Sequence, residues 1–138
     1  MMGKRSGRKS VTASHESPGL DLAVPACAES SPVLRQELRR FLERLALGRD
    51  RIADVVLAVG EATSNAIEHA YRGREGMVWL RAVAAPERLV IEVLDQGRWR
   101  LDASPERGRG LGIMRALVDD VAIESTREGT LVRFEVLL

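Results

Sequence analysis

The stretch GEATSNAIEHAY, residues 60–71, decides the fold of this 138-residue chain. It is the second half of a segment, residues 51–71, in which apolar residues recur every three or four positions, as on the buried face of a helix. Glu61, Asn65 and Glu68 are spaced so that they follow one line of that helix, beside the apolar face. Polar groups in such a place face either water or a ligand, and the rest of the sequence decides between these.

The bulk composition predicts a single globular domain with an aliphatic core. The chain is 45% hydrophobic but only 4% aromatic, so Leu, Val, Ile and Ala must supply most of the core. One cysteine, Cys27, excludes an internal disulfide framework and a cysteine-cluster zinc site, which fits a reducing compartment. No apolar run approaches the roughly 20 residues of a membrane span, and no apolar segment of a signal peptide follows the basic N-terminus. We therefore expect a cytoplasmic protein that does not associate with membranes.

Charge is distributed unevenly along the chain. Residues 1–17 contain four basic residues and one acidic residue, a net charge of +3, so the formal charge of +1 leaves −2 for the remainder. This first segment is rich in Gly, Ser, Lys and Arg, and we expect a disordered basic tail that mainly aids solubility. Residues 18–138 are expected to fold as one domain, whose charge balance argues against direct binding of nucleic acid.

Two helices are predicted early in the chain. Ser31 as N-cap and Pro32 at the first helical position predict a helix over residues 31–47, which Gly48 closes. Asp50 is then expected to cap the helix over residues 51–71. The other predicted segments, in chain order, are a strand at 19–26, a hairpin of strands at 77–85 and 88–95, an irregular loop at 96–110, a helix at 111–121, and a closing hairpin of strands at 121–126 and 130–138.

The order of these segments predicts an α+β fold. Each of the two predicted hairpins consists of two strands joined by a short turn, which indicates a sheet that is mostly antiparallel. An amphipathic helix must bury its apolar stripe against another element. We therefore expect a two-layer α/β sandwich with the helices on one face of the sheet.

Two motifs place polar side chains where a helix or a strand can aim them at a ligand. On the long helix, the amide oxygen of Asn65 suits Mg²⁺, a hard cation usually shared with phosphates, and Glu61 one turn earlier can orient or deprotonate an attacking hydroxyl. At the end of a strand, Asp95 in DQG can accept a hydrogen bond from an exocyclic amino group such as that of adenine, and Gly97 lets the backbone approach a flat ring. Taken alone, each motif is more often ordinary, a solvated helix face in the first case and a turn in the second.

Two further motifs, GRGLG and GT, are expected near the phosphates and the adenine of a nucleotide. GRGLG, residues 108–112, is expected to be a loop that runs into a helix and offers N–H groups to phosphates, with Arg107 and Arg109 adding positive charge. Thr130 in GT, at the start of a strand, can reach the adenine side with its hydroxyl. Glycines also form plain loops, and GT is common in hairpin turns, so the order and spacing of the four motifs together carry the argument.

Taken together, the motifs resemble the GHKL ATPase superfamily, which includes gyrase-type, chaperone-type and histidine-kinase ATP-binding domains. The matching residues are EATSNAIEHAYRG at 61–73, DQGRWR at 95–100, GRGLGIMRALVDDV at 108–121 and GT at 129–130. More narrowly, the pattern is similar to that of the small bacterial anti-sigma-factor serine/threonine protein kinases. The likeness covers nearly all of residues 19–138.

This resemblance implies a fold and a set of residue roles. The fold is the histidine-kinase-like ATPase sandwich, with ATP between the long helix, the sheet and a short lid. Glu61 corresponds to the catalytic base, Asn65 to the Mg²⁺ ligand and Asp95 to the carboxylate that reads adenine. The resemblance further matches Gly97 and Thr130 on the adenine side, and Gly108 and Gly110 at the lid and the phosphates. Arg107, Arg109, Leu111 and Gly112 of the same segment complete the expected nucleotide-binding residues.

The resemblance also implies a function and partners for the ATP-binding kinase domain, residues 18–138. Kinases of this kind phosphorylate a serine of an anti-anti-sigma (STAS-type) protein and bind a sigma factor, often as homodimers. The superfamily often shows a D-x-G-x-G pattern, whereas this chain has Trp99 at the second glycine, and its lid from Arg98 to Arg107 is short. We therefore expect the adenine end of the lid to be built differently.

Three alternatives stay open from the sequence alone. The domain can hold a sigma factor or another regulator without catalysis. It can be the ATP-binding part of a two-component histidine kinase, but that class needs a phospho-acceptor histidine, and the chain has only His15 in the tail and His69 in the motif helix. The motifs can also be coincidental in an unrelated α/β domain. A phosphorylated serine on a partner would separate the kinase from the regulator-binding module.

Overall fold

The computed structural model describes residues 19–97 and 105–138, with side chains in the second range described from residue 110. The elements, in chain order, are β1 (Gly19–Pro25), α1 (Ser30–Glu43), α2 (Arg49–Asn65), the π-helix η2 (Ala66–Ala70), β2 (Met77–Ala84), β3 (Arg88–Asp95), α3 (Pro105–Leu117), β4 (Asp120–Thr126) and β5 (Gly129–Leu137). Within these described ranges, no helix is long and apolar enough to cross a membrane.

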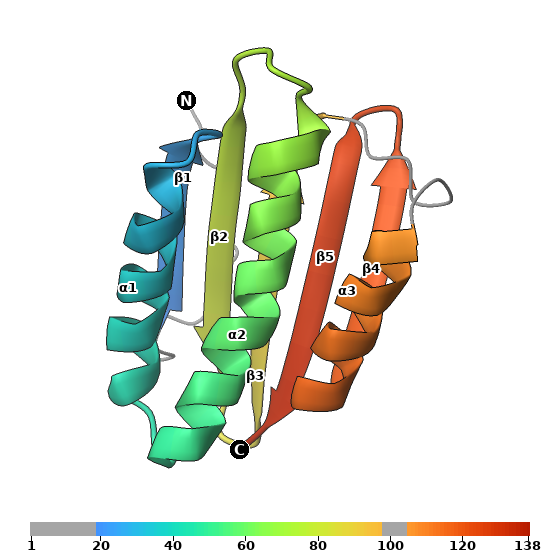
Figure 1. Ribbon diagram of the computed structural model, residues 1–138. Helices are drawn as coiled ribbons and strands as arrows, with labels where there is room; N and C mark the ends of the chain where they lie inside the picture. Colours follow the sequence, from blue (N-terminus) through green and yellow to red (C-terminus); the bar gives the residue numbers. More distant parts are fainter. Residues whose placement is uncertain (1–18, 98–104) are drawn as a thin grey trace.

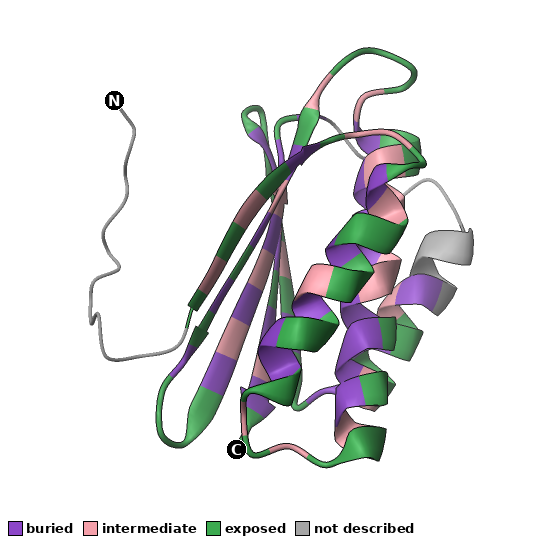
Figure 2. Cartoon of the chain, turned by 90° about the vertical axis from the view of Figure 1, so that its left-hand side faces the viewer, coloured by how far each residue is buried: buried purple, intermediate pink, exposed green. Residues whose placement is uncertain are grey.

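The five strands form one antiparallel sheet in the order β1-β2-β3-β5-β4. Figure 1 shows α1, α2 and α3 lying side by side over one face of this sheet. In the side view of Figure 2, the helices form one layer and the sheet forms the other. The predicted α+β sandwich, with helices on one face of an antiparallel sheet, is therefore confirmed.

The core lies between the helices and the covered face of the sheet. Along β2, Val78, Leu80 and Ala82 are buried, while the intervening Trp79 and Arg81 alternate to the opposite face. This period of two repeats in β3 and β5. The core is mainly aliphatic, as the composition predicts, and its largest fully buried side chains include Phe41, Phe134, Leu34, Leu38, Leu42, Leu80, Leu89 and Ile91.

Both ends of α1 differ from the predicted ones. The helix begins at Ser30, one residue before the predicted N-cap Ser31, and Pro32 is its third residue. A turn fixes this start, because the N–H of Ser30 donates to the carbonyl of Cys27 at 3.0 Å. The helix ends at Glu43 rather than at 47, because the next N–H groups bond to carbonyls only three residues earlier and tighten the last turn.

The long helix also departs from the prediction at both ends. α2 starts at Arg49 with Gly48 as its N-cap, and Asp50 lies inside the first turn without a side-chain capping bond. An acidic side chain in that place is favoured by the positive end of the helix dipole. α-Helical bonding stops at Asn65, and η2 continues the chain with bonds that span five residues. The prediction of one continuous α-helix is therefore wrong over its last turn.

The third helix begins earlier than the sequence predicts. It starts at Pro105, a residue well suited to the first helical position, so residues 108–112 lie inside the helix. The prediction that GRGLG forms a loop before a helix is therefore wrong. Each glycine weakens a helix interior by about 1 kcal/mol relative to alanine, but α3 packs against α2, and such tertiary packing outweighs the intrinsic preference.

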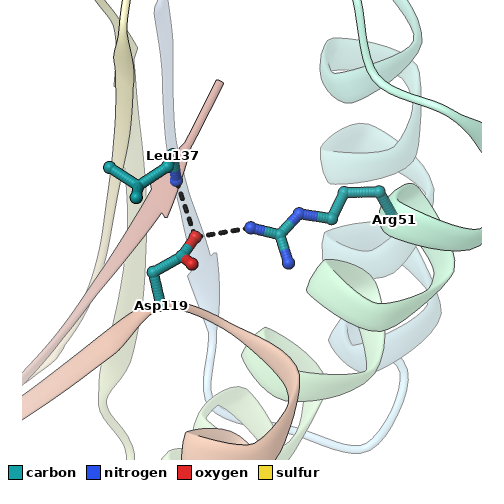
Figure 3. A network of polar contacts seen from close by, with 3 residues as sticks. All are labelled: Arg51, Asp119 and Leu137. Atoms are coloured by element: carbon teal, nitrogen blue, oxygen red, sulfur yellow. Dashed lines mark hydrogen bonds and ion pairs between the residues drawn. The ribbon is translucent and has the colours of Figure 1, made fainter.

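A polar contact ties the start of α2 to the far end of the sheet (Figure 3). The guanidinium of Arg51 donates to Oδ2 of Asp119 at 2.5 Å, and the backbone N–H of Leu137 donates to the same oxygen at 2.7 Å. Asp119 thereby satisfies a backbone group near the end of β5 and holds the helix layer against the sheet. This contact lies at the opposite end of β5 from Thr130.

Candidate functional site

The polar residues of α2 face the first turns of α3. Glu61 and Asn65 are half-buried, one helical turn apart. A Cβ atom placed on Gly110 of α3 would lie 3.0 Å from Oε1 of Glu61 and 3.9 Å from Nδ2 of Asn65. The carboxylate of Glu61 therefore lies directly against the α3 backbone at Gly110, where a larger residue would displace it. The structure brings these three predicted site residues together, although they are separated by up to 49 positions in the sequence.

The π-helix removes Glu68 from this group. Its side chain is 64% exposed, and its carboxylate lies 3.7 Å from Nε2 of the neighbouring His69, which is also exposed. A π-turn holds more residues than an α-turn, so the positions after Asn65 are rotated relative to a straight α-helix. The predicted single line of Glu61, Asn65 and Glu68 is therefore broken after its second member.

A second group of predicted residues meets where β3 ends and β5 begins. Asp95 and Thr130 are paired across the two strands and are only 5% and 3% exposed. The N–H of Gly97 donates to Oδ1 of Asp95 at 3.0 Å, which closes the turn after β3. The hydroxyl of Thr130 lies 3.4 Å from that of Ser125 on β4. An acidic side chain so deeply buried among backbone and hydroxyl groups is held in one orientation, as the recognition of a ligand requires.

Gly129 is required next to this pair. Its φ is +143°, in the region that favours glycine, and a Cβ there would lie 1.9 Å from the carbonyl oxygen of Asp95. The glycine of the GT motif therefore allows β5 to start directly against the end of β3. Its role is steric, and it fixes the position from which Thr130 presents its hydroxyl.

Gly97 joins the end of the motif helix to the same turn. A Cβ on Gly97 would lie 2.0 Å from the carbonyl oxygen of Ala70 and 2.8 Å from the Cβ of Ala70, and Gly97 itself is buried. The residue is thus needed for close packing against η2, which is a different reason from the predicted approach to a flat ring. This contact links the helix that carries Glu61 and Asn65 to the turn that carries Asp95.

Several predicted residues are placed differently or cannot be placed. Gly112 is exposed, with no heavy atom within 4 Å of a Cβ built on it, so it does not join Gly110 at α2. Leu111 is partly buried and packs against the apolar core. Residues 105–109 belong to the backbone of α3, but the side chains of Arg107 and Arg109, and the surroundings of Gly108, are outside the described part. The predicted lid ran from Arg98 to Arg107. Residues 98–104 of it, with Trp99, are outside the described part, and residues 105–107 belong to α3 rather than to a loop.

One residue at this site was given no role by the sequence. Tyr71, directly after η2, accepts a hydrogen bond from the N–H of Gln96 at 2.8 Å and donates one to the carbonyl of Met77 at 2.5 Å. It therefore touches the turn between Asp95 and Gly97 from the helix side. Its place in the motif marks it only as the end of a helix, so the sequence offered no sign of these contacts.

A separate hollow of about 400 Å³ lies on the other face of the sheet. Its apolar floor consists of Trp79, Leu94 and Leu131, which alternate with the buried residues of their strands. Its rim reaches the strand ends at Asp95 and Thr130, but its described lining includes no residue of α2 or α3. The hollow is therefore distinct from the place where Glu61 and Asn65 meet Gly110.

The donors at the helix side suit a cation that is shared with a ligand. Among the residues that the structure describes, no three His, Cys, Asp or Glu side chains cluster as a metal cage. Glu61 and Asn65 each carry a hard oxygen donor, one helical turn apart, and Oε1 of Glu61 and the amide group of Asn65 lie nearest to Gly110. Mg²⁺ is typically held by one or two protein oxygens together with phosphate oxygens, so this donor set fits a magnesium–nucleotide complex.

Comparison with known proteins finds a matching family and named relatives. Residues 24–136 match the family described as the histidine kinase-like ATPase domain. The anti-sigma F factor of Caldanaerobacter subterraneus subsp. tengcongensis is 30% identical over 128 residues, covering 83% of this chain and 90% of that protein. The serine-protein kinase RsbW of Bacillus subtilis is 29% identical over 124 residues, covering 77% of this chain and 78% of that protein.

Solved structures share the fold. The structure of the RsbU and RsbW domains of Rv1364c from Mycobacterium tuberculosis has a TM-score of 0.73 and 27% identity; it matches 87% of this chain, which spans 32% of that one. The histidine kinase domain of the blue-light activated kinase from Erythrobacter litoralis EL346 has a TM-score of 0.56 over 82% of this chain, at 23% identity. The second likeness concerns the fold alone.

Proposed function

Because this chain belongs to the family of histidine kinase-like ATPase domains, we propose that it is an anti-sigma-factor serine/threonine kinase. It binds ATP with Mg²⁺, transfers the γ-phosphoryl group to a serine of an anti-anti-sigma protein, and sequesters a sigma factor. The relatives named as anti-sigma F factor and as serine-protein kinase support both halves of this proposal. A homodimer is part of the same proposal.

The observation that carries the proposal is that Glu61 and Asn65 of α2 meet Gly110 of α3 in one place. A nucleotide laid along α2 would have its phosphates here and its base at the turn after β3. Asp95 accepts a hydrogen bond from the exocyclic amino group of adenine, and Thr130 contributes its hydroxyl beside it. The phosphates would lie near the first turns of α3, where the free N–H groups of a helix start favour negative charge. We assign Gly110 to this end of the nucleotide, and extend to Arg107, Gly108 and Arg109 the phosphate-binding role that the resemblance to the family implies.

In the proposed reaction, the protein acts mainly through position and charge. Asn65 holds the bound Mg²⁺, which would offset the negative charge of the phosphates. Glu61 accepts the proton of the attacking serine hydroxyl and holds its oxygen in line with the γ-phosphorus. Phosphoryl transfer has little covalent chemistry for the protein to perform, so orientation and electrostatic stabilisation supply most of the acceleration.

Replacing Asn65 by alanine tests the cation site. We expect wild-type protein to bind ATP more tightly with Mg²⁺ than with excess EDTA, and the variant to lose most of that difference, because one protein oxygen of the cation's coordination is gone. Calorimetric titration of both proteins with ATP, once with Mg²⁺ and once with excess EDTA, measures this difference in affinity. Gln36→Ala, which removes an exposed amide from α1, is the matched control and should keep the Mg²⁺ effect. An Asn65→Ala protein with a full Mg²⁺ effect would contradict the assignment.

The alternative, a catalytically silent module that only binds a sigma factor, differs in one outcome. It predicts sigma-factor binding without phosphorylation of any partner serine. Mass spectrometry of the cognate anti-anti-sigma protein after incubation with this chain, ATP and Mg²⁺ separates the two. A gain of one phosphate on a serine supports the kinase, and an unmodified partner supports the silent module.

A further inference from the structure

The hydroxyl of Tyr71 occupies an unusual place between two strands of the sheet. The β2–β3 register pairs Val78 with Asp95, so the next pair along the strands is Met77 and Gln96. The N–H of Gln96 donates to the Tyr71 hydroxyl at 2.8 Å, and that hydroxyl donates to the carbonyl of Met77 at 2.5 Å. A side chain thus stands between the two backbone groups that face each other at the end of the ladder.

The hydrogen bond that follows β1 indicates that the backbone groups of Met77 and Gln96 would otherwise bond to each other directly. The N–H of Ala26 donates to the carbonyl of Gly76 at 2.8 Å, so the backbone groups of Gly76 point toward β1. Hydrogen-bonding groups of successive residues in a strand point alternately to one neighbour and the other. The groups of Met77 therefore point toward β3. The Tyr71 hydroxyl replaces a bond between Gln96 and Met77, and two hydrogen-bond lengths span the gap instead of one.

The ring of Tyr71 is held firmly enough for this role. A Cβ on Gly76 would lie 2.2 Å from Cε1 of Tyr71, so the ring packs directly over the Gly76 backbone. The chain then reverses through Arg72 and Gly73, both with positive φ, at +52° and +83°. A non-glycine residue in the left-handed region is uncommon and persists where the surroundings over-determine it. The N–H of Arg74 closes the reversal on the carbonyl of Tyr71 at 2.9 Å.

We propose that Tyr71 is a positioning residue for recognition of the nucleotide base. Its hydroxyl stands between the last facing backbone groups of β2 and β3, those of Met77 and Gln96. It thereby sets where the turn from Asp95 to Gly97 lies relative to α2 and η2. The residue itself touches no substrate, and it acts through the orientation of Asp95. This inference rests on the proposed function, because it assigns the base-reading role to Asp95.

The test compares wild-type protein with Tyr71→Phe, which keeps the ring over Gly76 and removes both hydrogen bonds. The measurements are the affinities for ATP and for GTP, each with Mg²⁺. We expect the affinity for ATP to fall about tenfold, because a misplaced Asp95 would lose about one hydrogen bond to the amino group of adenine. The affinity for GTP, whose base lacks the amino group that Asp95 would read, should change little. The preference for ATP over GTP should therefore fall by about the same factor.

Asp119→Ala is the matched control. Asp119 also caps a backbone N–H at the end of a strand, that of Leu137, but at the other end of the sheet. A loss of general stability would appear in both variants, whereas a loss of base preference should appear only in Tyr71→Phe. Amide exchange gives a second readout that needs no nucleotide: the Gln96 amide should exchange faster in Tyr71→Phe, while the amides of β5 keep their protection.

The outcomes separate this inference from the function on which it rests. Wild-type protein that binds neither nucleotide overturns the proposed function. Wild-type protein that prefers ATP, together with a Tyr71→Phe variant that has the same preference and the same Gln96 exchange rate, overturns only the role of Tyr71. A fall in base preference confined to Tyr71→Phe supports it.

Discussion

Replacing Glu61 by glutamine is expected to lower the rate of phosphoryl transfer by a factor of about 10² to 10⁴, the contribution typical of a positioned general base. The glutamine side chain has nearly the same size and shape, so the contact with Gly110 and the packing of α2 on α3 stay as they are. It cannot take a proton from the serine hydroxyl at neutral pH. The affinity for ATP should therefore stay close to that of the wild type.

The measurement for Glu61 is the initial rate of phosphate incorporation into the cognate anti-anti-sigma protein, at saturating ATP. Glu68→Gln serves as its control, because Glu68 is on the following turn but its side chain is 64% exposed and lies outside the site. That variant should transfer phosphate at the wild-type rate. A Glu61→Gln protein with full activity would show that another group, or none, accepts the proton.

Replacing Gly97 by alanine is expected to have the largest effect on the fold at the site. The added Cβ would lie 2.0 Å from the carbonyl oxygen of Ala70, a backbone atom that cannot move without shifting η2. Overpacking of this kind typically costs about 1 to 3 kcal/mol and sometimes more, so we expect a fall of about 3 kcal/mol in the free energy of unfolding. ATP binding should weaken as well, because a shift of η2 would change the distance between Asp95 and the residues of α2.

Urea denaturation and ATP titration of the same preparations measure both effects of Gly97→Ala. Gly112→Ala is the control, since it adds the same methyl group at an exposed helical position with no heavy atom within 4 Å. Alanine is favoured over glycine inside a helix by about 1 kcal/mol, so this variant should be as stable as the wild type or slightly more so. Equal stability of Gly97→Ala and the wild type would mean that the turn is not pressed against η2.

The sequence predicted the strands well because each strand carries its own pattern. In β3, apolar residues alternate with others and short turns bound the strand, and the predicted range 88–95 agrees with Arg88–Asp95. Helix ends were predicted less well. The start of α1 depends on a turn with Cys27 that no residue preference encodes, and the glycines at 108–112 favoured a loop although α3 contains them.

At the candidate site, the sequence predicted residue types but not their packing. Glu61, Asn65 and Asp95 were singled out by order and spacing, and the structure places Gly110 beside the first two. No residue preference marks the π-helix after Asn65, and its packing against the turn after β3, through Ala70 and the neighbouring Tyr71, joins segments that are distant in the sequence. The sequence likewise predicted that Gly97 allows a flat ring to approach and that Gly129 belongs to a common hairpin turn, but not that both are points where two backbone segments meet.

The central claim is that ATP binds between α2, α3 and the turn after β3, with Asp95 reading its base. Calorimetric titration of wild-type protein and Asp95→Asn with ATP and Mg²⁺ tests it most directly. Asparagine keeps an acceptor for the N–H of Gly97 but turns one carboxylate oxygen into a donor, which opposes the amino group of adenine. The account predicts that the wild type binds ATP and that Asp95→Asn binds it about 10- to 100-fold more weakly, the loss expected for a hydrogen bond to a charged group. A wild type that does not bind ATP, or an Asp95→Asn variant that binds it equally well, would contradict the account.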